Sequence, residues 1–312
     1  MSMEGLKGRD FLRPADFSPA ELALVLDTAI EQKRAWAEGR RDAPLAGKAV
    51  ALIFQKPSMR TRVSFEVACA RLGATPVVLG GNDTVFSRGE TVYDTIKVLE
   101  RYCDAIVIRT FAQTLVEEIA GVARVPVVNA LTDEYHPCQG LADLLTLREH
   151  KGNLAGLTLA YVGDGNNMAN TYLEVGALAG MNIRIATPKE FEPLPAAVIA
   201  AQEIAAQTGA TIDVGYDAES AVKGADAIAA DTWASMGQED EHTERVAVFA
   251  PYCVDESLMA GSALGAVFMH CLPAHRGEEV TDAVIDSGAS IVFDEAENRL
   301  HAQKALLSLL LG

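Results

Sequence analysis

The sequence predicts an α/β fold with two doubly wound, parallel-sheet domains. Short runs of β-branched and other apolar residues recur along the chain, and amphipathic stretches with helical spacing lie between them. The apolar runs are nearly continuous rather than alternating, which is typical of strands buried on both faces of a parallel sheet. Strand–helix alternation along the whole length is the pattern of an α/β protein.

The segment 150–156, "HKGNLAG", has the glycine and asparagine content of a linker, and predicted strands lie on both sides of it. We therefore place the domain boundary there, with domains at 1–150 and 151–312. The predicted strands are 48–54, 74–80, 104–110 and 125–130 in the first domain, and 157–163, 182–188, 211–216, 225–231, 265–271 and 290–295 in the second. The predicted helices are 65–72, 91–101, 141–150, 170–179 and 195–208, followed by a final amphipathic helix that begins near Arg299.

Composition limits the classes of function. The 312 residues suit two domains, and 49% apolar with 22% charged residues favours a soluble globular protein. No stretch approaches the roughly 20 apolar residues of a membrane span, and the start has no apolar signal core, so we expect a cytoplasmic location. Five scattered cysteines give neither a disulfide framework nor paired metal ligands. The formal charge of −17 argues against a nucleic-acid surface, so any anion site must be local.

One short stretch, 56–65 or "KPSMRTRVSF", concentrates cations in this acidic chain. Ser58 suits the N-cap of a helix, so backbone N–H groups and nearby hydroxyls would surround the helix start. Arg60 adds a planar donor group that fits an oxyanion. Because the helix dipole disfavours cations there, the stretch predicts a phosphate cradle; a solvated helix start is the alternative. We expect Lys56 to be solvated and Arg62 to have a structural or interface partner.

Other polar side chains follow further predicted strands, where parallel α/β proteins collect their ligands. Arg109 ends one strand, and the loop "DEYHPCQG" follows another and leads into a helix whose first turn suits Pro137. Taken singly, such residues are more often structural than functional. Together they predict a binding site, whose members from this pattern are Arg109, His136, Gln139, Cys271, His275 and Arg299.

The second half carries a different set of polar groups. The segment 161–171, "YVGDGNNMANT", opens a helix after a strand, but Met168 stands where the third glycine of a dinucleotide-binding fingerprint belongs. It offers instead the amides of Asn166 and Asn167, which can bind a carboxylate or an amine. Asp231 follows another strand and can hold an ammonium group, with the loop 235–237 after it.

These residues resemble the ornithine carbamoyltransferases. The motifs "SMRTR", "HPCQGLADLLT", "GDGNNMANT", "DTWASMGQE", "HCLPAHRGEEV" and "FDEAENRLHAQKALL" occur in the order and at about the spacing of that family, from about Phe11 to the C-terminus. The patterns SxRTR and HPxQ are shared by all transcarbamylases, whereas DxxxSMG together with HCLP is specific to the ornithine branch.

The resemblance implies transfer of the carbamoyl group of carbamoyl phosphate to the δ-amine of L-ornithine, giving L-citrulline and phosphate, in amino-acid metabolism such as arginine biosynthesis. It implies a carbamoyl phosphate-binding domain at 1–150, an ornithine-binding domain at 151–312 and a C-terminal helix that returns to the first domain. It also implies a homotrimer, or a multiple of trimers, with active sites at subunit interfaces, and neither a cofactor nor a catalytic metal. Anabolic and catabolic members use the same residues, so the sequence does not choose between them.

The resemblance also implies the site residues. Those for carbamoyl phosphate are Ser58, Met59, Arg60, Thr61, Arg109, His136, Pro137, Cys138, Gln139, Cys271, Leu272 and Arg299. Those for ornithine are Asn167, Asp231, Ser235, Met236, Cys271 and Leu272. The residues with a catalytic part are Arg60, Arg109, His136, Cys271 and Arg299.

The sequence departs from the family at two positions. Met59 replaces the common threonine of SxRTR and so loses a hydroxyl. Val85 stands where members commonly carry a glutamine or histidine that they lend to the neighbouring subunit's phosphate site. We expect Arg88 or Ser87 to substitute for that side chain.

The implied mechanism is positioning and electrostatic stabilisation. As the neutral δ-amine attacks the carbamoyl carbon, negative charge grows on the carbonyl oxygen and the departing phosphate, where the arginines meet it. His136 would donate to the carbonyl oxygen, Asp231 would hold the α-ammonium group, and Asn167 the α-carboxylate. Cys271 would hydrogen-bond the carbonyl oxygen or the δ-amine; a small buried apolar residue is the alternative. Activity should rise toward alkaline pH because the δ-amine must lose a proton.

Other interpretations stay open. A different acceptor (aspartate, putrescine or N-acetylornithine) agrees with the first-half motifs, although Asp231 disfavours aspartate. A nicotinamide-dependent oxidoreductase would use "GDGNN" but lacks the third glycine. A metal site formed by His270, Cys271 and His275 is disfavoured because a strand sends residues 270 and 271 to opposite faces. A non-enzymatic binding protein of this fold is the last alternative.

Overall fold

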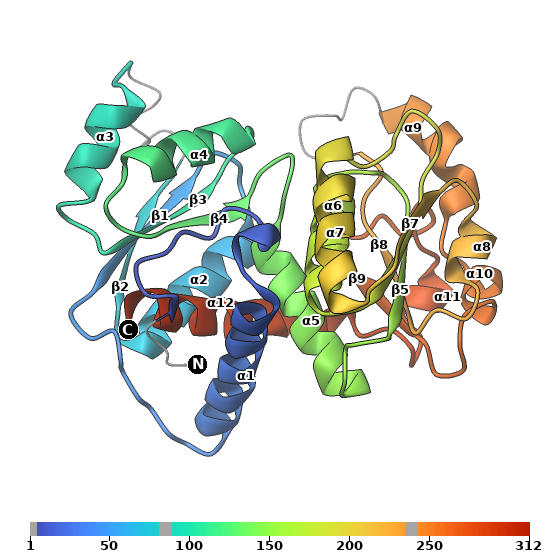
Figure 1. Ribbon diagram of the computed structural model, residues 1–312, viewed down its shortest axis with the longest axis horizontal. Coiled ribbons are helices and arrows are strands. Elements are labelled where there is room, and N and C mark those ends of the chain that lie inside the picture. Colours follow the sequence, from blue (N-terminus) through green and yellow to red (C-terminus); the bar gives the residue numbers. More distant parts are fainter. Residues whose placement is uncertain (1–4, 81–88, 235–241) are drawn as a thin grey trace. The chain divides into compact units, whose positions relative to one another are not determined.

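The computed structural model describes residues 5–80, 89–234 and 242–312. The chain divides into two compact units, Met1–Leu145 with Glu297–Gly312, and Thr146–Ala296. Each unit is built on its own parallel β-sheet with helices on both faces (Figure 1), which confirms the predicted fold class. Among the described residues, no helix is long and apolar enough to cross a membrane.

The first unit contains a four-stranded sheet. Its strands are β1 (Ala49–Phe54), β2 (Thr75–Leu79), β3 (Ala105–Arg109) and β4 (Val127–Leu131), in the order β2-β1-β3-β4. Its helices are α1 (Pro19–Ala37), α2 (Met59–Leu72), α3 (Val92–Leu99), α4 (Gln113–Val122) and α5 (Pro137–Lys151), whose end continues into the second unit; a 3-10 turn occupies Pro14–Asp16. Helices α3 and α4 lie on one face of the sheet and α2 on the other (Figure 1).

This strand order reverses beside β1, which places the ends of β1 and β3 together. Phe54 at the end of β1 pairs with Arg109 at the end of β3. Every residue of β1 after Ala49 is buried, so the apolar run that predicts the strand also fixes it inside the unit. In open α/β sheets, ligands bind outside the carboxyl ends of strands at such a reversal. The loops that follow β1 and β3 therefore lie where a ligand is expected.

The second unit contains a five-stranded sheet. Its strands are β5 (Thr158–Val162), β6 (Asn182–Ala186), β7 (Ile212–Gly215), β8 (Ala227–Ala230) and β9 (Val267–His270), in the order β7-β6-β5-β8-β9. The helices that begin in this unit are α6 (Asn167–Leu178), α7 (Pro195–Thr208), α8 (Ala218–Val222), α9 (His242–Phe249), α10 (Glu256–Ala260), α11 (Asp282–Ile285) and α12 (Val292–Leu311), with a 3-10 turn at Ala250–Tyr252. Helices α6 and α7 cover one face and α8 and α10 the other (Figure 1). The order reverses between β5 and β8, so the loops after these strands meet at that end of the sheet.

The predicted strand 290–295 is wrong. Val292 begins α12, and Ser290 makes only an isolated bridge to Phe268. Asp294 and Glu295 lie in the first turn of the helix, where the helix dipole favours carboxylates. A short apolar run does not by itself distinguish a strand from a buried helix, and here the acidic residues that follow favour the helix.

Helices α1, α4 and α8 to α11 lie where no helix is predicted. The start of α1 nevertheless has a clear local cause. Ser18 is its N-cap and accepts a hydrogen bond from the N–H of Glu21, whose carboxylate accepts one from the N–H of Ser18. Pro19 fills the first helical position, where its missing N–H costs nothing. The sequence therefore contains the signal for α1.

Candidate functional site

In the first unit, the predicted anion site begins at the N-terminus of α2. Ser58 is the N-cap, and its Oγ accepts a hydrogen bond from the backbone N–H of Thr61 at 3.2 Å. The cap is as predicted, while the helix begins at Met59 rather than at residue 65. The first N–H groups of a helix have no acceptor within it, so they suit an anion. The Met59 side chain is 73% exposed, and Met59 provides the first main-chain N–H of α2.

The other two cations of this stretch have protein partners. Lys56 has only 4% of its surface exposed; its ammonium group donates to the Asp133 carboxylate and lies 4.3 Å from the centre of the Phe111 ring. The expectation that Lys56 is solvated is therefore wrong, because Asp133 and Phe111, which are distant in the sequence, contact its ammonium group. Arg62 pairs with Glu66 at 2.7 Å, one turn along the exposed face of α2, as a structural partner would.

Arg299 on α12 is held in place by two neighbours. It is buried, with Nη1 donating to Gln139 Oε1 at 2.6 Å and Nη2 donating to Thr61 Oγ1 at 3.2 Å. Gln139 also donates from Nε2 to Asp143 Oδ1 at 2.7 Å. These bonds join α12, α5 and α2, so three predicted site residues that are far apart in the sequence come together. The two bonds also fix the plane of the guanidinium group.

His136 lies in the field of three predicted site arginines. Burial holds its pKa well below the ordinary value, and the positive charges of Arg299, Arg109 and Arg60 lower it further. The imidazole is therefore neutral at physiological pH and able to donate an N–H. Arg109 is itself buried at the end of β3. Such a concentration of positive charge, in a chain of net charge −17, favours a bound anion.

Pro137 and Cys138 form the first turn of α5, as the position of Pro137 predicts. The Cys138 thiol donates to the backbone oxygen of Asn129 at 3.4 Å, and burial raises its pKa to about 12. A thiol with so high a pKa is not a nucleophile at neutral pH. Any contact of these two residues with a ligand would have to come from their main chain.

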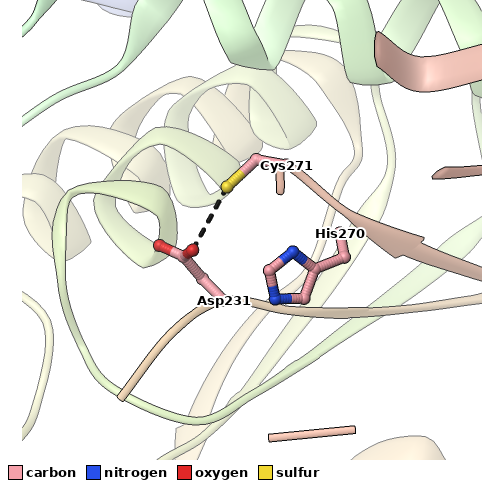
Figure 2. A group of neighbouring side chains, drawn as sticks. All are labelled: Asp231, His270 and Cys271. Atoms are coloured by element: carbon pink, nitrogen blue, oxygen red, sulfur yellow. Dashed lines mark hydrogen bonds between the residues drawn. The ribbon is translucent and has the colours of Figure 1, made fainter. Parts of the chain in front are cut away.

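In the second unit, Asp231 is the centre of a polar cluster at the ends of β5, β8 and β9. One carboxylate oxygen, Oδ2, accepts from Asn166 Nδ2 at 2.9 Å. The other, Oδ1, accepts from the Cys271 thiol at 3.1 Å (Figure 2). Asp231 is 8% exposed, so its charge is available to a ligand in a mostly dry surrounding. An ammonium group is the ligand that such a carboxylate suits.

Both amide atoms of Asn166 form hydrogen bonds within the protein. Its Oδ1 accepts from the N–H groups of Met168 and Ala169 and so caps α6, and it also accepts from the Tyr161 hydroxyl at 3.2 Å. Its Nδ2 supports Asp231. Asn167, the first residue of α6, is half-buried beside it. Asn166 therefore supports Asp231 here, and the prediction that Asn166 and Asn167 bind a ligand stays a prediction.

His270, Cys271 and Asp231 have potential metal-ligating atoms within 4.8 Å of one another (Figure 2). The expectation that residues 270 and 271 point to opposite faces is wrong, because β9 ends at His270. Both ring nitrogens of His270 are nevertheless engaged: Nδ1 accepts from the Leu272 N–H at 2.9 Å, and Nε2 lies 3.1 Å from Glu279 Oε1. A metal would have to break these bonds, so the donor set does not fit a resident ion. A second group of three, His275, Glu278 and Glu279, is likewise close together.

Leu272 adopts φ 58°, in the left-handed region that residues other than glycine rarely occupy. Its N–H is fixed by His270, and the preceding Cys271 is half-buried. Unfavourable backbone conformations of this kind are concentrated at functional sites. The loop that contains the predicted residues Cys271 and Leu272 therefore has the character of a site loop.

Asp164 and Arg245 are polar residues near Asp231 that the predicted site does not include. Arg245, on α9, donates from Nη2 to the Asp164 carboxylate and from Nε to the Trp233 carbonyl. Burial raises the pKa of Asp164 to about 7, against the lowering effect of Arg245, and the Asp231 charge raises it further. Arg245 belongs to no motif, so no signal in a single sequence marks it.

The glycines of "GDGNN" serve close packing. A Cβ on Gly165 would come 2.2 Å from the backbone oxygen of Phe191, and the Gly165 N–H donates to that oxygen at 2.9 Å. The loop after β5 is therefore pressed against residues 191–193. This contact occupies the place where a dinucleotide fingerprint keeps its backbone open to a pyrophosphate, which further disfavours the nicotinamide interpretation.

Several predicted residues lie outside the described part of the chain. They are Ser235 and Met236 of the predicted ornithine site, and Val85, Ser87 and Arg88 of the predicted subunit-interface position.

Comparison with known proteins gives a consistent result over the whole chain. Residues 9–149 match the family described as aspartate/ornithine carbamoyltransferase, carbamoyl-P binding domain, and residues 155–310 match its Asp/Orn binding domain. The chain is 52% identical to the ornithine carbamoyltransferase of Parasynechococcus marenigrum, over 100% of this chain and 96% of that one. It is 53% identical to that of Anoxybacillus flavithermus, over 98% of both. The solved ornithine carbamoyltransferase of Pyrococcus furiosus superposes with a TM-score of 0.96 at 48% identity, over 98% of each chain; that of Gloeobacter violaceus gives 0.88 at 47%, over 98% and 99%.

Proposed function

Because this chain belongs to the aspartate/ornithine carbamoyltransferase family, we propose that it transfers the carbamoyl group of carbamoyl phosphate to the δ-amine of L-ornithine. The products are L-citrulline and phosphate. The observation that carries this proposal is the contrast between the units: the first gathers guanidinium groups around a neutral histidine, and the second presents a supported, buried carboxylate. The first suits a phosphate, and the second suits the ammonium group of an amino acid.

In the first unit, carbamoyl phosphate binds at the start of α2. Ser58 to Thr61 supply backbone donors for the phosphate, and the arginines at positions 60, 109 and 299 supply positive charge. Gln139 and Thr61 hold Arg299 in one orientation before the substrate arrives. Neutral His136 donates an N–H to the carbamoyl oxygen, and it keeps its proton because no base is needed at that atom.

In the second unit, Asp231 binds the α-ammonium group of ornithine, and Asn167 binds the α-carboxylate. The Cys271 thiol, which donates to Asp231 in this structure, is released to hydrogen-bond the carbonyl oxygen or the δ-amine. Cys271 and Leu272 stay predicted members of both substrate sites, and Ser235 and Met236 of the ornithine site.

The δ-amine attacks carbamoyl phosphate directly, by addition and elimination. The lone pair of the neutral δ-amine forms a bond to the carbamoyl carbon while the carbonyl electrons move onto oxygen. When the carbonyl re-forms, the bond to the phosphate oxygen breaks, phosphate leaves with that electron pair, and the extra proton on the new nitrogen passes to the departing phosphate. The arginines act by stabilising the charge that develops on both oxygens.

A panel of acceptors tests the proposal. The purified chain is incubated with carbamoyl phosphate and, in parallel, with ornithine, putrescine, aspartate and N-acetylornithine, and both the ureido product and phosphate are measured. We expect citrulline and phosphate in equal amounts. The kcat/KM for ornithine should be at least about 100-fold above that for any other acceptor, because Asp231 binds the α-ammonium group and Asn167 the α-carboxylate. A higher kcat/KM for any other acceptor, or no ureido product from any of them, would overturn it.

The active assembly is proposed to be a homotrimer or a multiple of trimers. Apolar side chains are exposed on two helices of the first unit, with Met59 and Val63 on α2 and Tyr93 and Val98 on α3 between 46% and 73% exposed. Contact with a neighbouring subunit would cover such exposed apolar side chains. Light scattering should give the mass of three chains or a multiple, and a monomeric active enzyme would contradict it.

The prediction that Arg88 or Ser87 reaches the neighbouring subunit's phosphate site is tested separately. An Arg88→Ala variant should have a raised KM for carbamoyl phosphate, and an unchanged value counts against it. The cytoplasmic location also stays a prediction.

A further inference from the structure

A buried arginine in the second unit connects segments on both sides of Asp231. Arg245 is 7% exposed, and its guanidinium carbon lies 4.8 Å from the centre of the Phe191 ring and 5.1 Å from that of Phe249. Its Nη2 donates to the carboxylate of Asp164, in the loop after β5. Its Nε donates to the carbonyl oxygen of Trp233, two residues after Asp231. One side chain thus ties α9 to both loops at the strand-order reversal of this sheet.

Two buried carboxylates lie close together in this region, so a cation inside the protein would stabilise them. Asp164 and Asp231 are both only 8% exposed, and their negative charges repel each other enough to influence the pKa of Asp164. The other titratable groups near the pair are Tyr161, whose pKa is raised by burial and by the charges of the two aspartates, Cys271 and Glu279, and His270. A ring nitrogen of His270 lies within 4.8 Å of Asp231, and its Nε2 is 3.1 Å from Glu279. Arg245 is the arginine that bonds the Asp164 carboxylate directly.

We propose that Arg245 is a positioning residue for the amino-acid substrate. It holds the Asp164 loop and the Asp231 segment in fixed positions relative to each other, and it compensates the charge of Asp164. Asp231 is thereby placed to bind the α-ammonium group. This inference rests on the proposed function and adds to it a residue that does not touch the substrate.

The contacts give two routes from Arg245 to Asp231. Along the first, Asp164 is followed by Gly165 and Asn166, and Asn166 Nδ2 donates to Asp231 Oδ2 at 2.9 Å. Along the second, Trp233 lies two residues beyond Asp231 in the chain and stacks on Phe249, with ring centres 5.9 Å apart. Without Arg245, both loops lose a fixed point, and Asp164 is left buried without its charge partner. The carboxylate that receives the ammonium group would then shift.

Three variants and one control separate this role from a purely structural one. Arg245→Met removes the charge and both donors. Arg245→Lys keeps the charge but cannot form the planar fork. Asp164→Asn keeps the shape and removes the second carboxylate charge. The control is Arg184→Met, because Arg184 also bonds two backbone carbonyls within this unit, those of Ala221 and Lys223, on a strand away from Asp231.

The readouts are kcat, the KM of each substrate and the inhibition constant of L-norvaline, which has the α-groups of ornithine without its δ-amine. For Arg245→Met we expect the ornithine KM and the norvaline constant to rise together by about 10- to 100-fold, with a smaller rise for Arg245→Lys. The carbamoyl phosphate KM should change by less than about threefold, as should every constant of the control. In the double variant with Asp164→Asn, the effects should not add, because the two residues act through one bond.

Two outcomes would overturn the inference. One is an ornithine KM and a norvaline constant within about twofold of wild type in Arg245→Met. The other is an equal loss for both substrates with no rescue by Arg245→Lys, which is the result of a general folding defect. If the proposed function itself fails, the wild-type chain makes no citrulline, whereas failure of this inference leaves wild-type activity intact.

Discussion

Replacing Arg299 tests whether the first unit is organised to stabilise negative charge. The guanidinium group donates from two different nitrogens, to Gln139 at 2.6 Å and to Thr61 at 3.2 Å, and the single nitrogen of a lysine cannot reproduce this planar fork. Hydrogen bonds that involve a charged group contribute about 1.5–3 kcal/mol each. Loss of one preorganised donor to a developing oxyanion costs about 2.7–4 kcal/mol, or 10²–10³ in kcat. We therefore expect kcat to fall on the order of 100-fold in Arg299→Lys and about 1000-fold in Arg299→Met.

The assay is initial-rate citrulline formation with both substrates saturating, together with the KM of each. The matched control is Arg124→Met, which removes a guanidinium from the same unit where the side chain is 83% exposed. Urea unfolding of each variant shows whether the fold is kept. A folded Arg299→Lys variant with kcat within about threefold of wild type would refute the reasoning, since the lost fork would then have no part in the reaction.

Three further outcomes follow from the same geometry. His136 should stay neutral from pH 6 to 9, so that kcat/KM for ornithine rises with pH because of the δ-amine alone; since its pKa is lower when folded than when unfolded, stability should fall as pH drops below about 6.5. An inflection assigned to His136 by NMR within pH 6–9 would contradict this. Gly165→Ala should weaken ornithine binding and lower the urea midpoint, because a Cβ would come 2.2 Å from the Phe191 oxygen, and an unchanged variant would show that the loop has room to move. Lys56→Met should destabilise the protein by about 1–3 kcal/mol, mainly because the contact with the Phe111 ring is lost, since the carboxylate partner is 56% exposed. An unchanged free energy of unfolding in urea would show that these contacts of Lys56 do not stabilise the protein.

The fold class was predictable because it depends on local patterns. The run "AVALIF" becomes β1, as expected because strands buried on both faces of a parallel sheet are nearly continuous apolar runs in the sequence. Ser58 was predictable as a cap because the N–H that donates to its hydroxyl, that of Thr61, lies only three residues away. The run 290–295 misleads for the same reason, because its apolar residues satisfy both a strand and a buried helix.

Interactions between distant residues could not be predicted from pattern. Lys56 is buried by Asp133, 77 residues later, and Arg245 bonds Asp164, 81 residues earlier. Neither pair has a spacing or motif that a single sequence displays. The convergence of strand-end residues was predictable in kind, because parallel strands share one carboxyl edge. The contacts among these residues, such as those of Arg299 with Gln139 and Thr61, depend on tertiary packing, which a single sequence does not display.

The central claim is that each unit recognises one substrate, and the KM values of two variants test it most directly. Arg60→Met changes the first unit, and Asp231→Asn changes the second without altering the shape of the side chain. We predict that Arg60→Met raises the KM for carbamoyl phosphate at least about tenfold, and that Asp231→Asn does the same for ornithine, each with little effect on the other substrate. An Asp231→Asn enzyme that keeps the wild-type KM for ornithine would contradict the claim.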